Sequence, residues 1–315
     1  MQGLFNKIVM KNSLLLIISM AIALSICAQK QTPDTNYANR VTSVTWMPDG
    51  KSLLFSVVKF HKQNHQAPFF SRVFSYELAT GKITELFENG SSLSPSPNGK
   101  TIAFLKRDDK RSADIYLYQI ENKQQSLLAS DTTKKNSLSW SPDGKKIMYN
   151  ISHKGEHQHA TIDICVLDVA TGKVKQVTES HPHKSYSPAW CPDSKKIVYY
   201  LEKGDDNDQI WLTDDEGSFH TNLTNDTTTH NYFPSWLDEK TIYYTQDPET
   251  IMTMKIDGSQ KQKLEGINHY HVKFSPAAGL FAYVQEDPEN NIVVFDRQKK
   301  TTKVLIDEGT IKGLF

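Results

Sequence analysis

The stretch Trp140-Ser-Pro-Asp-Gly-Lys-Lys-Ile-Met-Tyr149 joins an aromatic residue, a tight-turn sequence and a short apolar run. Proline presets φ for the first corner of the turn, aspartate bonds its own backbone, and glycine accepts a positive φ. The apolar residues after the turn suit a strand whose two faces are both buried between neighbouring sheets. This segment therefore predicts the start of a sheet that is stacked against other sheets.

Five further segments follow the same plan along the chain. With the aromatic position or its replacement as the origin, they begin at Trp46, Pro95, Trp190, Trp236 and Phe274. The repeat length is about 45 residues, which is typical of β-propeller blades built from four short strands. We therefore expect an all-β, six-bladed β-propeller with four antiparallel strands in each blade. The Trp, Pro, Asp and Gly residues of the repeat are expected to be architectural and to belong to no functional site.

The second half of each repeat is equally regular. In the third repeat, Ile162–Val166 is a predicted strand, Ala170–Lys173 a hairpin turn, and Val174–Val177 a polar-alternating outer strand. No stretch shows sustained helical periodicity. After an N-terminal arm at residues 29–39, the expected blades span about 40–88, 89–133, 134–180, 181–228, 229–266 and 267–315.

The N-terminus has the pattern of a secretory signal peptide. Lys11 precedes an apolar run from Leu14 to Ile26, and Ala28 offers a small residue at the cleavage site. The run is too short for a membrane span, which needs about 20 residues. We expect residues 1–28 to be removed and the protein to be periplasmic or secreted and not membrane-spanning. Lipoprotein anchoring at Cys27 is the less favoured alternative, because Ile26 stands where a small residue is expected, and Met10 is an alternative start.

Composition excludes some partners and limits the covalent cross-links. The 36 Lys and Arg residues balance the 36 Asp and Glu residues, so no overall field would attract a nucleic acid. After cleavage only Cys165 and Cys191 remain, and two buried thiols are expected in place of a disulfide framework.

The repeated Trp-Ser-Pro-Asp-Gly-Lys block resembles the repeat of the TolB-like propeller superfamily, a WD40-like (PD40) repeat. The superfamily includes the periplasmic TolB protein, propeller domains of prolyl-oligopeptidase-type peptidases, and oligogalacturonate lyases. The resemblance covers nearly all of the mature chain and implies the fold without implying one function. TolB carries an α/β domain ahead of its propeller and a peptidase carries a hydrolase domain. We expect neither here, because only residues 29–39 separate the predicted signal peptide from the first expected blade and the sequence stops at Phe315. The link to the Tol system therefore stays open.

Motifs of common enzyme classes are missing from the sequence. It contains no Gly-x-Ser-x-Gly, no Gly-x-Gly-x-x-Gly and no Walker loop. His153-Lys-Gly-Glu-His157 has the letters of an inverted zinc-protease motif, which acts only on a helix. Because Gly155 interrupts it and it joins two predicted strands, we expect a solvated loop.

Histidines and tyrosines recur just before the innermost strands of the fourth to sixth repeats. Because inner strands begin at one end of the central channel, this placement allows their side chains to converge across the axis. The interpretation that we favour is that they are ordinary polar residues of rim loops, and contact with a ligand or partner is the alternative. The candidate rim residues are His181, His183, His230, His269 and His271, with Tyr186, Tyr232 and Tyr270.

Three functions fit these observations. The first, which we favour, is a non-enzymatic scaffold that binds a periplasmic or envelope protein or peptide through one face, with no cofactor and no catalytic residue. The second is a metal-dependent oligogalacturonate-lyase-like enzyme with His183, His230 and His271 (or His269) as ligands of a divalent ion. His181-Pro-His183 is similar to a metal-binding stretch of those lyases, although Thr178 replaces the glutamine that the resemblance implies. The third is a periplasmic small-ligand sensor.

Overall fold

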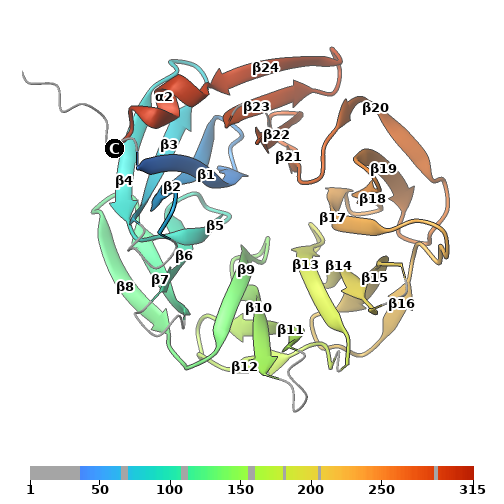
Figure 1. Cartoon of the computed structure of the whole chain (residues 1–315). Helices are drawn as coiled ribbons and strands as arrows, with labels where there is room; N and C mark the ends of the chain where they lie inside the picture. The colour runs from blue at the N-terminus through green and yellow to red at the C-terminus, as the bar shows by residue number, and fades with distance from the viewer. Residues whose placement is uncertain are drawn as a thin grey trace, which may run out of the picture.

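The computed structural model describes residues 36–64, 70–107, 113–154, 160–179, 182–204, 207–286 and 290–315. These residues form a ring of β-sheets around a central axis, with the first strand of each repeat innermost (Figure 1). The predicted signal peptide at residues 1–28 lies outside the described residues. Within the described ranges, no helix is long and apolar enough to cross a membrane.

The ring consists of four four-stranded sheets and one eight-stranded sheet. The first sheet contains β1 (Tyr37–Trp46), β2 (Ser52–His61), β3 (Phe70–Glu77) and β4 (Ile83–Glu88), and the second β5 (Ser91–Pro95), β6 (Thr101–Arg107), β7 (Ala113–Gln119) and β8 (Gln124–Ala129). The eight-stranded sheet contains β9 (Lys134–Trp140), β10 (Lys146–Lys154), β11 (Ala160–Asp168), β12 (Val174–Gln176), β13 (Lys184–Trp190), β14 (Lys196–Glu202), β15 (Gln209–Asp214) and β16 (His220–Asn222). The last two contain β17 (Asn231–Asp238), β18 (Thr241–Gln246), β19 (Thr250–Lys255) and β20 (Gln262–Asn268), then β21 (Lys273–Ser275), β22 (Leu280–Gln285), β23 (Asn291–Asp296) and β24 (Thr301–Ile306).

The predicted all-β propeller is confirmed. The predicted six blades do not appear as six separate sheets, because the third and fourth repeats share the eight-stranded sheet. A single parallel pair, Ile162 with Lys184, joins β11 to β13, and all other pairings in that sheet are antiparallel. The strand bounds also differ slightly from the expected repeats. β1 begins at Tyr37, within the expected arm, and β20 continues to Asn268, two residues beyond the expected end of its repeat.

The turn between β9 and β10 shows why the repeat has its sequence. The Ser141 hydroxyl donates to Asp143 Oδ1 over 2.7 Å, and Asp143 Oδ1 also accepts from the Lys145 amide over 3.1 Å. Gly144 adopts φ +72°, which L-residues other than Asn and Asp rarely do. The turn then directs Ile147 into β10, where it is fully buried, as the apolar run predicts.

Three of the repeated tryptophans connect one inner strand to the inner strand of the preceding repeat around the ring. Trp236 Nε1 donates to the Ala189 carbonyl over 3.0 Å, and Trp190 Nε1 donates to the Ser139 carbonyl over 3.3 Å. In the same way, Trp46 Nε1 donates over 2.8 Å to the carbonyl of Lys273, in the last sheet. These indoles satisfy backbone carbonyls of the neighbouring inner strand, so the repeated aromatic position has the architectural role expected of it.

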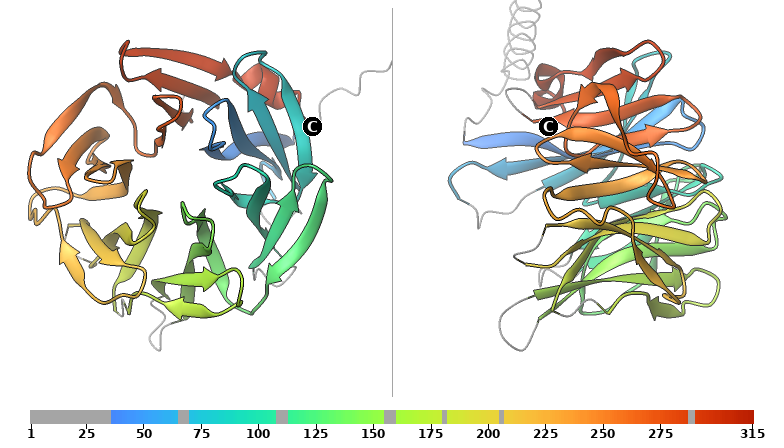
Figure 2. Two further views of the ribbon diagram at one scale, coloured as in Figure 1. Left: turned by 180° about the vertical axis from the view of Figure 1, so that it is seen from behind. Right: turned by 90° about the vertical axis from the view of Figure 1, so that its right-hand side faces the viewer.

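The first and last sheets are joined by side chains and by a short helix, α2 (Glu308–Lys312), which packs beside β1 (Figure 2). Asp307 caps this helix, accepting from the Thr310 amide over 2.7 Å. Ile311 is fully buried in the core that the first and last sheets share. Asn39 Nδ2 donates to the carbonyls of Ile311 and Lys312, each over 3.3 Å. This helix could not be predicted from the sequence, because five residues are too few to show a helical period.

Candidate functional site

The channel wall has two chemically different halves, as equivalent positions of the six repeats show. The residue four places before the repeat's aromatic position is small and polar in the first three repeats and tyrosine in the last three. In chain order, these residues are Thr42, Ser91, Asn136, Tyr186, Tyr232 and Tyr270. Five of these residues lie on inner strands and Tyr270 lies in the loop just before β21, so the three tyrosines come from neighbouring sheets on one side of the ring.

The next position shows the same division and a backbone irregularity. The register of the inner strand shifts here in the first five repeats, and φ is +50° at Ser92, +54° at Ser137, +45° at Ser187 and +49° at Phe233. Serine also occupies the first repeat, and histidine the sixth, as Ser43 and His271. A positive φ is strained for a bulky residue, and such strain often marks a functional position. Phe233 therefore departs from a serine pattern at a cost in backbone energy.

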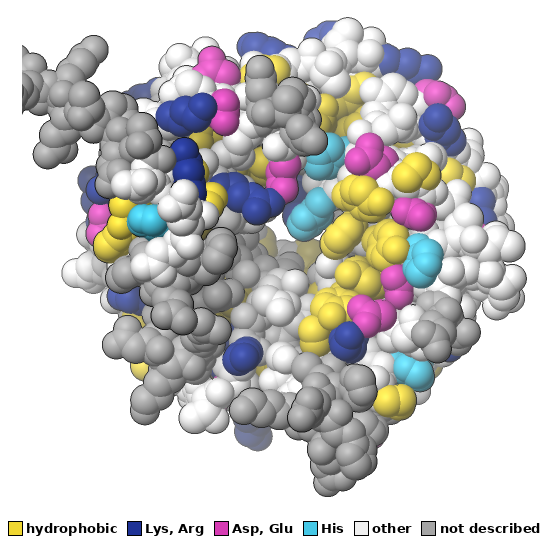
Figure 3. Space-filling model, viewed as in Figure 1, with side chains coloured by type: hydrophobic (Ala, Val, Ile, Leu, Met, Phe, Trp, Pro, Cys, Tyr) yellow, Lys and Arg dark blue, Asp and Glu magenta, His cyan; other side chains and the backbone are white. Residues whose placement is uncertain are grey.

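The aromatic residues form one continuous surface, which we call the aromatic half-rim. Tyr186 stacks on Tyr200 with 5.2 Å between ring centroids, and Tyr200 meets Tyr232 edge to face at 5.6 Å. The ring centroids of Tyr232 and Tyr270 lie 6.4 Å apart. Its members are Tyr186, Tyr200, His230, Tyr232, Phe233, Tyr270 and His271. Figure 3 shows hydrophobic, histidine and acidic side chains gathered together on the face that carries the channel mouth.

His230 is held between an aromatic ring and a carboxylate. Its imidazole stacks on Tyr232 with 5.7 Å between centroids and 5° between the planes. Its Nδ1 lies 3.2 Å from both the backbone nitrogen and Oδ2 of Asp208. Burial raises the pKa of Asp208, and the hydrogen bond from His230 opposes that shift in part. The pair therefore fixes the His230 ring at the edge of the half-rim.

The tyrosines of the half-rim act as neutral hydrogen-bond donors. Burial, with the nearby charges of Asp208 and Asp247, raises the pKa of Tyr232 to about 12. The Tyr270 hydroxyl donates to Asp247 Oδ1 over 3.1 Å, and 40% of Tyr270 is exposed. Both phenols therefore stay protonated near neutral pH and can donate hydrogen bonds.

The two histidines near β21 have different surroundings. The ring of His271 stacks on Phe233, whereas the ring of His269 packs against Tyr283 at 4.5 Å and takes no part in the half-rim. Desolvation lowers the pKa of both imidazoles, and the charge of Lys273 lowers that of His271 further. His271 remains accessible to solvent although protein surrounds it on the channel wall. Both rings are therefore neutral at pH 7.

The other predicted rim residues have different outcomes. His181 lies outside the described residues. His183 is half-buried just ahead of β13, and no hydrogen bond or ring contact joins it to another described residue. Among the residues that the structure describes, no three His, Cys, Asp or Glu side chains are grouped so as to hold a metal ion. His183, His230 and His271 therefore do not meet as a three-ligand set.

Sequence reasoning missed Tyr200, Phe233 and the acidic partners Asp208 and Asp247. Tyr200 lies in β14 directly opposite Tyr186, and such cross-strand neighbours touch. Aligning the two strands from their connecting turn would have pointed to Tyr200. Phe233 would have been found as the aromatic residue in a column of serines.

Thr178, which stands five residues before His183, has a structural role. It is buried, its Oγ1 accepts from the Ile164 amide over 2.9 Å, and it donates to Asp163 Oδ1 over 3.1 Å. Thr224 repeats the arrangement in the next repeat, accepting from the Ile210 amide over 3.0 Å. Thr178 thus holds the end of an outer strand.

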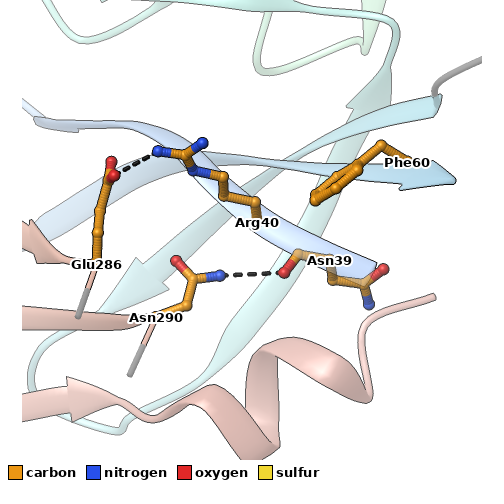
Figure 4. A pocket seen from close by; sticks show the side chains of 5 residues that line it. All are labelled: Asn39, Arg40, Phe60, Glu286 and Asn290. Carbon is orange, nitrogen blue, oxygen red and sulfur yellow. Dashed lines mark hydrogen bonds and ion pairs between the residues drawn. The ribbon is translucent and has the colours of Figure 1, made fainter. Parts of the chain in front are cut away.

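A shallow cavity of about 210 Å³ lies at the seam between the first and last sheets (Figure 4). Arg40 and Glu286 form an ion pair beside it, and Asn290 Nδ2 donates to the Asn39 carbonyl over 3.2 Å. Phe60 completes the lining. Since its polar groups bond one another across the seam, we assign this cavity to ring closure.

No family model matches the sequence, and no curated protein matches it. Solved structures do match. TolB from Acinetobacter baumannii superposes with a TM-score of 0.60 at 14% identity, over 89% of this chain and 86% of that chain. The chain has the fold of a TolB-like β-propeller.

Two further structures show how widely this TolB-like fold is used. The propeller domain of the Trilobed protease from Pyrococcus furiosus, described as having an open velcro topology, gives a TM-score of 0.58 at 13% identity, over 86% of this chain and 97% of that chain. Oligogalacturonate lyase from Vibrio parahaemolyticus gives 0.59 at 13% identity, over 86% and 78%. At such identities the likeness concerns the fold alone.

Proposed function

We propose that the protein is an exported six-bladed propeller that binds a protein or peptide partner through the face carrying the aromatic half-rim. The count of six takes the eight-stranded sheet as two blades of four strands. Support for this division comes from the single parallel pair that joins its halves and from the repeat motif at Trp140 and Trp190, one in each half. A periplasmic or secreted location follows from the signal-peptide pattern of residues 1–28.

The continuity of the half-rim carries the proposal. Aromatic rings from β13, β14 and β17 and from the loop before β21 touch in sequence, so distant parts of the chain present one surface. Tyrosine-rich surfaces that are held rigidly and combine an apolar ring with a polar hydroxyl are typical of interaction sites. A propeller supplies the rigid support that such a surface needs.

Two cavities of the described residues are small and lie away from the half-rim. They hold about 210 and 230 Å³, below the range of about 300–1,000 Å³ typical of small-molecule sites. Neither is lined by a member of the half-rim. A partner that covers the face would gain from the half-rim without needing a deep pocket.

A divalent metal and lyase chemistry form no part of the proposal. That alternative requires three imidazoles or carboxylates within reach of one ion, and the described residues bring no such set together. The position of Thr178 in a repeated structural hydrogen bond also supports a role unrelated to a ligand set.

Site-specific photo-crosslinking in the native host tests the proposal. A photoreactive phenylalanine analogue replaces Tyr270 at the half-rim or, as the control, Val304 on the outer strand β24, which is 48% exposed. We expect one discrete crosslinked protein from position 270 and none from position 304. Equal labelling at both positions, or no discrete product from position 270, contradicts partner binding through this face.

A further inference from the structure

Carboxylates surround the aromatic half-rim, and several of them have no cationic partner. Glu202 is paired with Lys184, and Glu286 with Arg40. Asp247 and Glu249 make no ion pair with a lysine or arginine among the described residues, and Asp208 contacts only the imidazole of His230 in this way. These three acidic groups all act electrostatically on tyrosines of the half-rim. The surface therefore combines aromatic faces with negative charge.

Tyr270 is the member of the half-rim that combines an exposed aromatic face with a neighbouring carboxylate. It is 40% exposed, and its ring is inclined by 57° to that of Tyr232. Its hydroxyl is 3.1 Å from Asp247 Oδ1, so a group lying on the Tyr270 face would also lie close to that carboxylate. A cation within about 6 Å of a tyrosine centroid is attracted by the ring, and a neighbouring carboxylate adds to the attraction.

We propose that the aromatic half-rim recognises an arginine side chain in a basic segment of a partner protein, placed over Tyr270 and beside Asp247 and Glu249. This inference rests on the proposed function and names the chemistry of the partner. Arginine suits the site because its planar guanidinium stacks on an aromatic ring while its N–H groups reach carboxylates.

The surrounding cations decide where on the half-rim the arginine binds. Lys184 and Arg40 are neutralised by their own carboxylates. Lys273 acts on His271, whose ring stacks on Phe233. Asp247 and Glu249 have no lysine or arginine partner among the described residues and act on Tyr270, so the arginine is placed over that ring.

A peptide-display selection tests the inference with the whole mature protein as bait. Random octapeptides are selected on three forms in parallel: the wild type, Tyr270→Ala, and the charge variant Asp247→Asn/Glu249→Gln. The charge variant keeps every aromatic ring and alters two exposed side chains, so it tests charge separately from shape. Thermal unfolding establishes beforehand that all three forms are folded.

We expect arginine to be enriched at least threefold among peptides selected on the wild type, and this enrichment to disappear on both variants. A synthetic copy of the best peptide should lose at least tenfold in affinity when citrulline replaces arginine. Peptides that depend on Tyr270 but show no basic enrichment overturn the arginine proposal and leave the proposed function standing. If no selected peptide depends on Tyr270, both are overturned.

Discussion

The phenyl ring of Phe233 stacks on the imidazole of His271, with 4.9 Å between centroids and 19° between planes. The two residues hold the same position in successive repeats, where the first four repeats have serine. Their contact therefore bridges two sheets at a place where the other sheets present only hydroxyls. Phe233 also keeps a φ of +49° to do so. The fifth and sixth repeats therefore differ from the first four at this position by having a ring in place of a hydroxyl.

Replacing Phe233 by serine, the residue of the other repeats, should abolish partner binding with little change in stability. The lost stack is worth about 0.5–1.5 kcal/mol, and serine adopts the same positive φ at the equivalent positions 92, 137 and 187, so the backbone adds no further cost. We expect the free energy of unfolding, measured with urea, to fall by less than about 2 kcal/mol. Phe281→Ala, in the core, is the contrasting variant and should lose about 3–5 kcal/mol. A similar loss for Phe233→Ser would show that Phe233 serves the core.

The indole of Trp236 should contribute more to stability than that of Trp140. Trp236 donates to the Ala189 carbonyl, whereas the buried Nε1 of Trp140 has no hydrogen-bond partner among the described residues. Both Trp→Phe changes remove the same atoms, but only Trp236→Phe leaves a carbonyl without its donor, costing about 1–3 kcal/mol more. Urea unfolding of the two variants measures the difference, and equal losses would contradict it.

A comparison of Gly217 with Gly172 separates the cost of a positive φ from the cost of crowding between neighbouring repeats. Both adopt a positive φ, +69° and +70°. A Cβ on Gly217 would lie 2.4 Å from the Val177 carbonyl oxygen, whereas one on Gly172 would meet nothing within 4 Å. Gly172→Ala should cost about 1 kcal/mol from φ alone, and Gly217→Ala at least twice that. Melting temperatures that fall equally would refute the close approach.

Ile311 should be a major contributor to ring closure. It is fully buried between the first and last sheets, and Ile311→Ala should reduce the free energy of unfolding by about 2–5 kcal/mol. Lys312→Ala, which removes an exposed ion pair with Glu308, should cost less than about 1 kcal/mol. Chemical denaturation of both variants provides the measurement. A small effect of Ile311→Ala would mean that the ring holds without α2.

Acid should destabilise the protein partly through His269 and His271. Desolvation lowers both folded pKa values below the unfolded value of 6.5. The unfolded chain therefore takes up these protons first as the pH falls, so the stability present above pH 6.5 is lost below it. In the variant His269→Gln/His271→Gln, the urea midpoint should fall less between pH 7 and pH 4.5 than in the wild type. Parallel curves would show that neither histidine is linked to folding.

The fold was predictable because each repeat contains the residues that specify its own turn. Pro142, Asp143 and Gly144 specify a hairpin without reference to the rest of the chain, and the buried run that follows does the same. Cys165 and Cys191 are free and buried, as expected. What the repeats could not specify were contacts across the seam, since α2 owes its position to packing on β1 and to no pattern of its own.

The candidate site was predicted in part, for a reason that lies in strand geometry. Tyr186, Tyr232 and Tyr270 share one offset from the aromatic position, so the ring brings them to the same level. His183 and His271 differ by four residues in that offset, which at about 3.3 Å per residue places them about 13 Å apart along the strand direction. Equal offsets predict neighbours in a propeller, and unequal offsets do not.

The hydrogen bond from Asn39 to the carbonyl of Ile311 spans 272 residues of sequence. Every sheet is made of consecutive strands, so the other contacts between sheets can form while the chain is still growing. The seam cannot, and a nascent chain must keep the apolar side of β1 uncovered until its final strands exist. Folding of this ring should therefore end with one slow, long-range step, and the interval before it is when the chain most needs protection from aggregation.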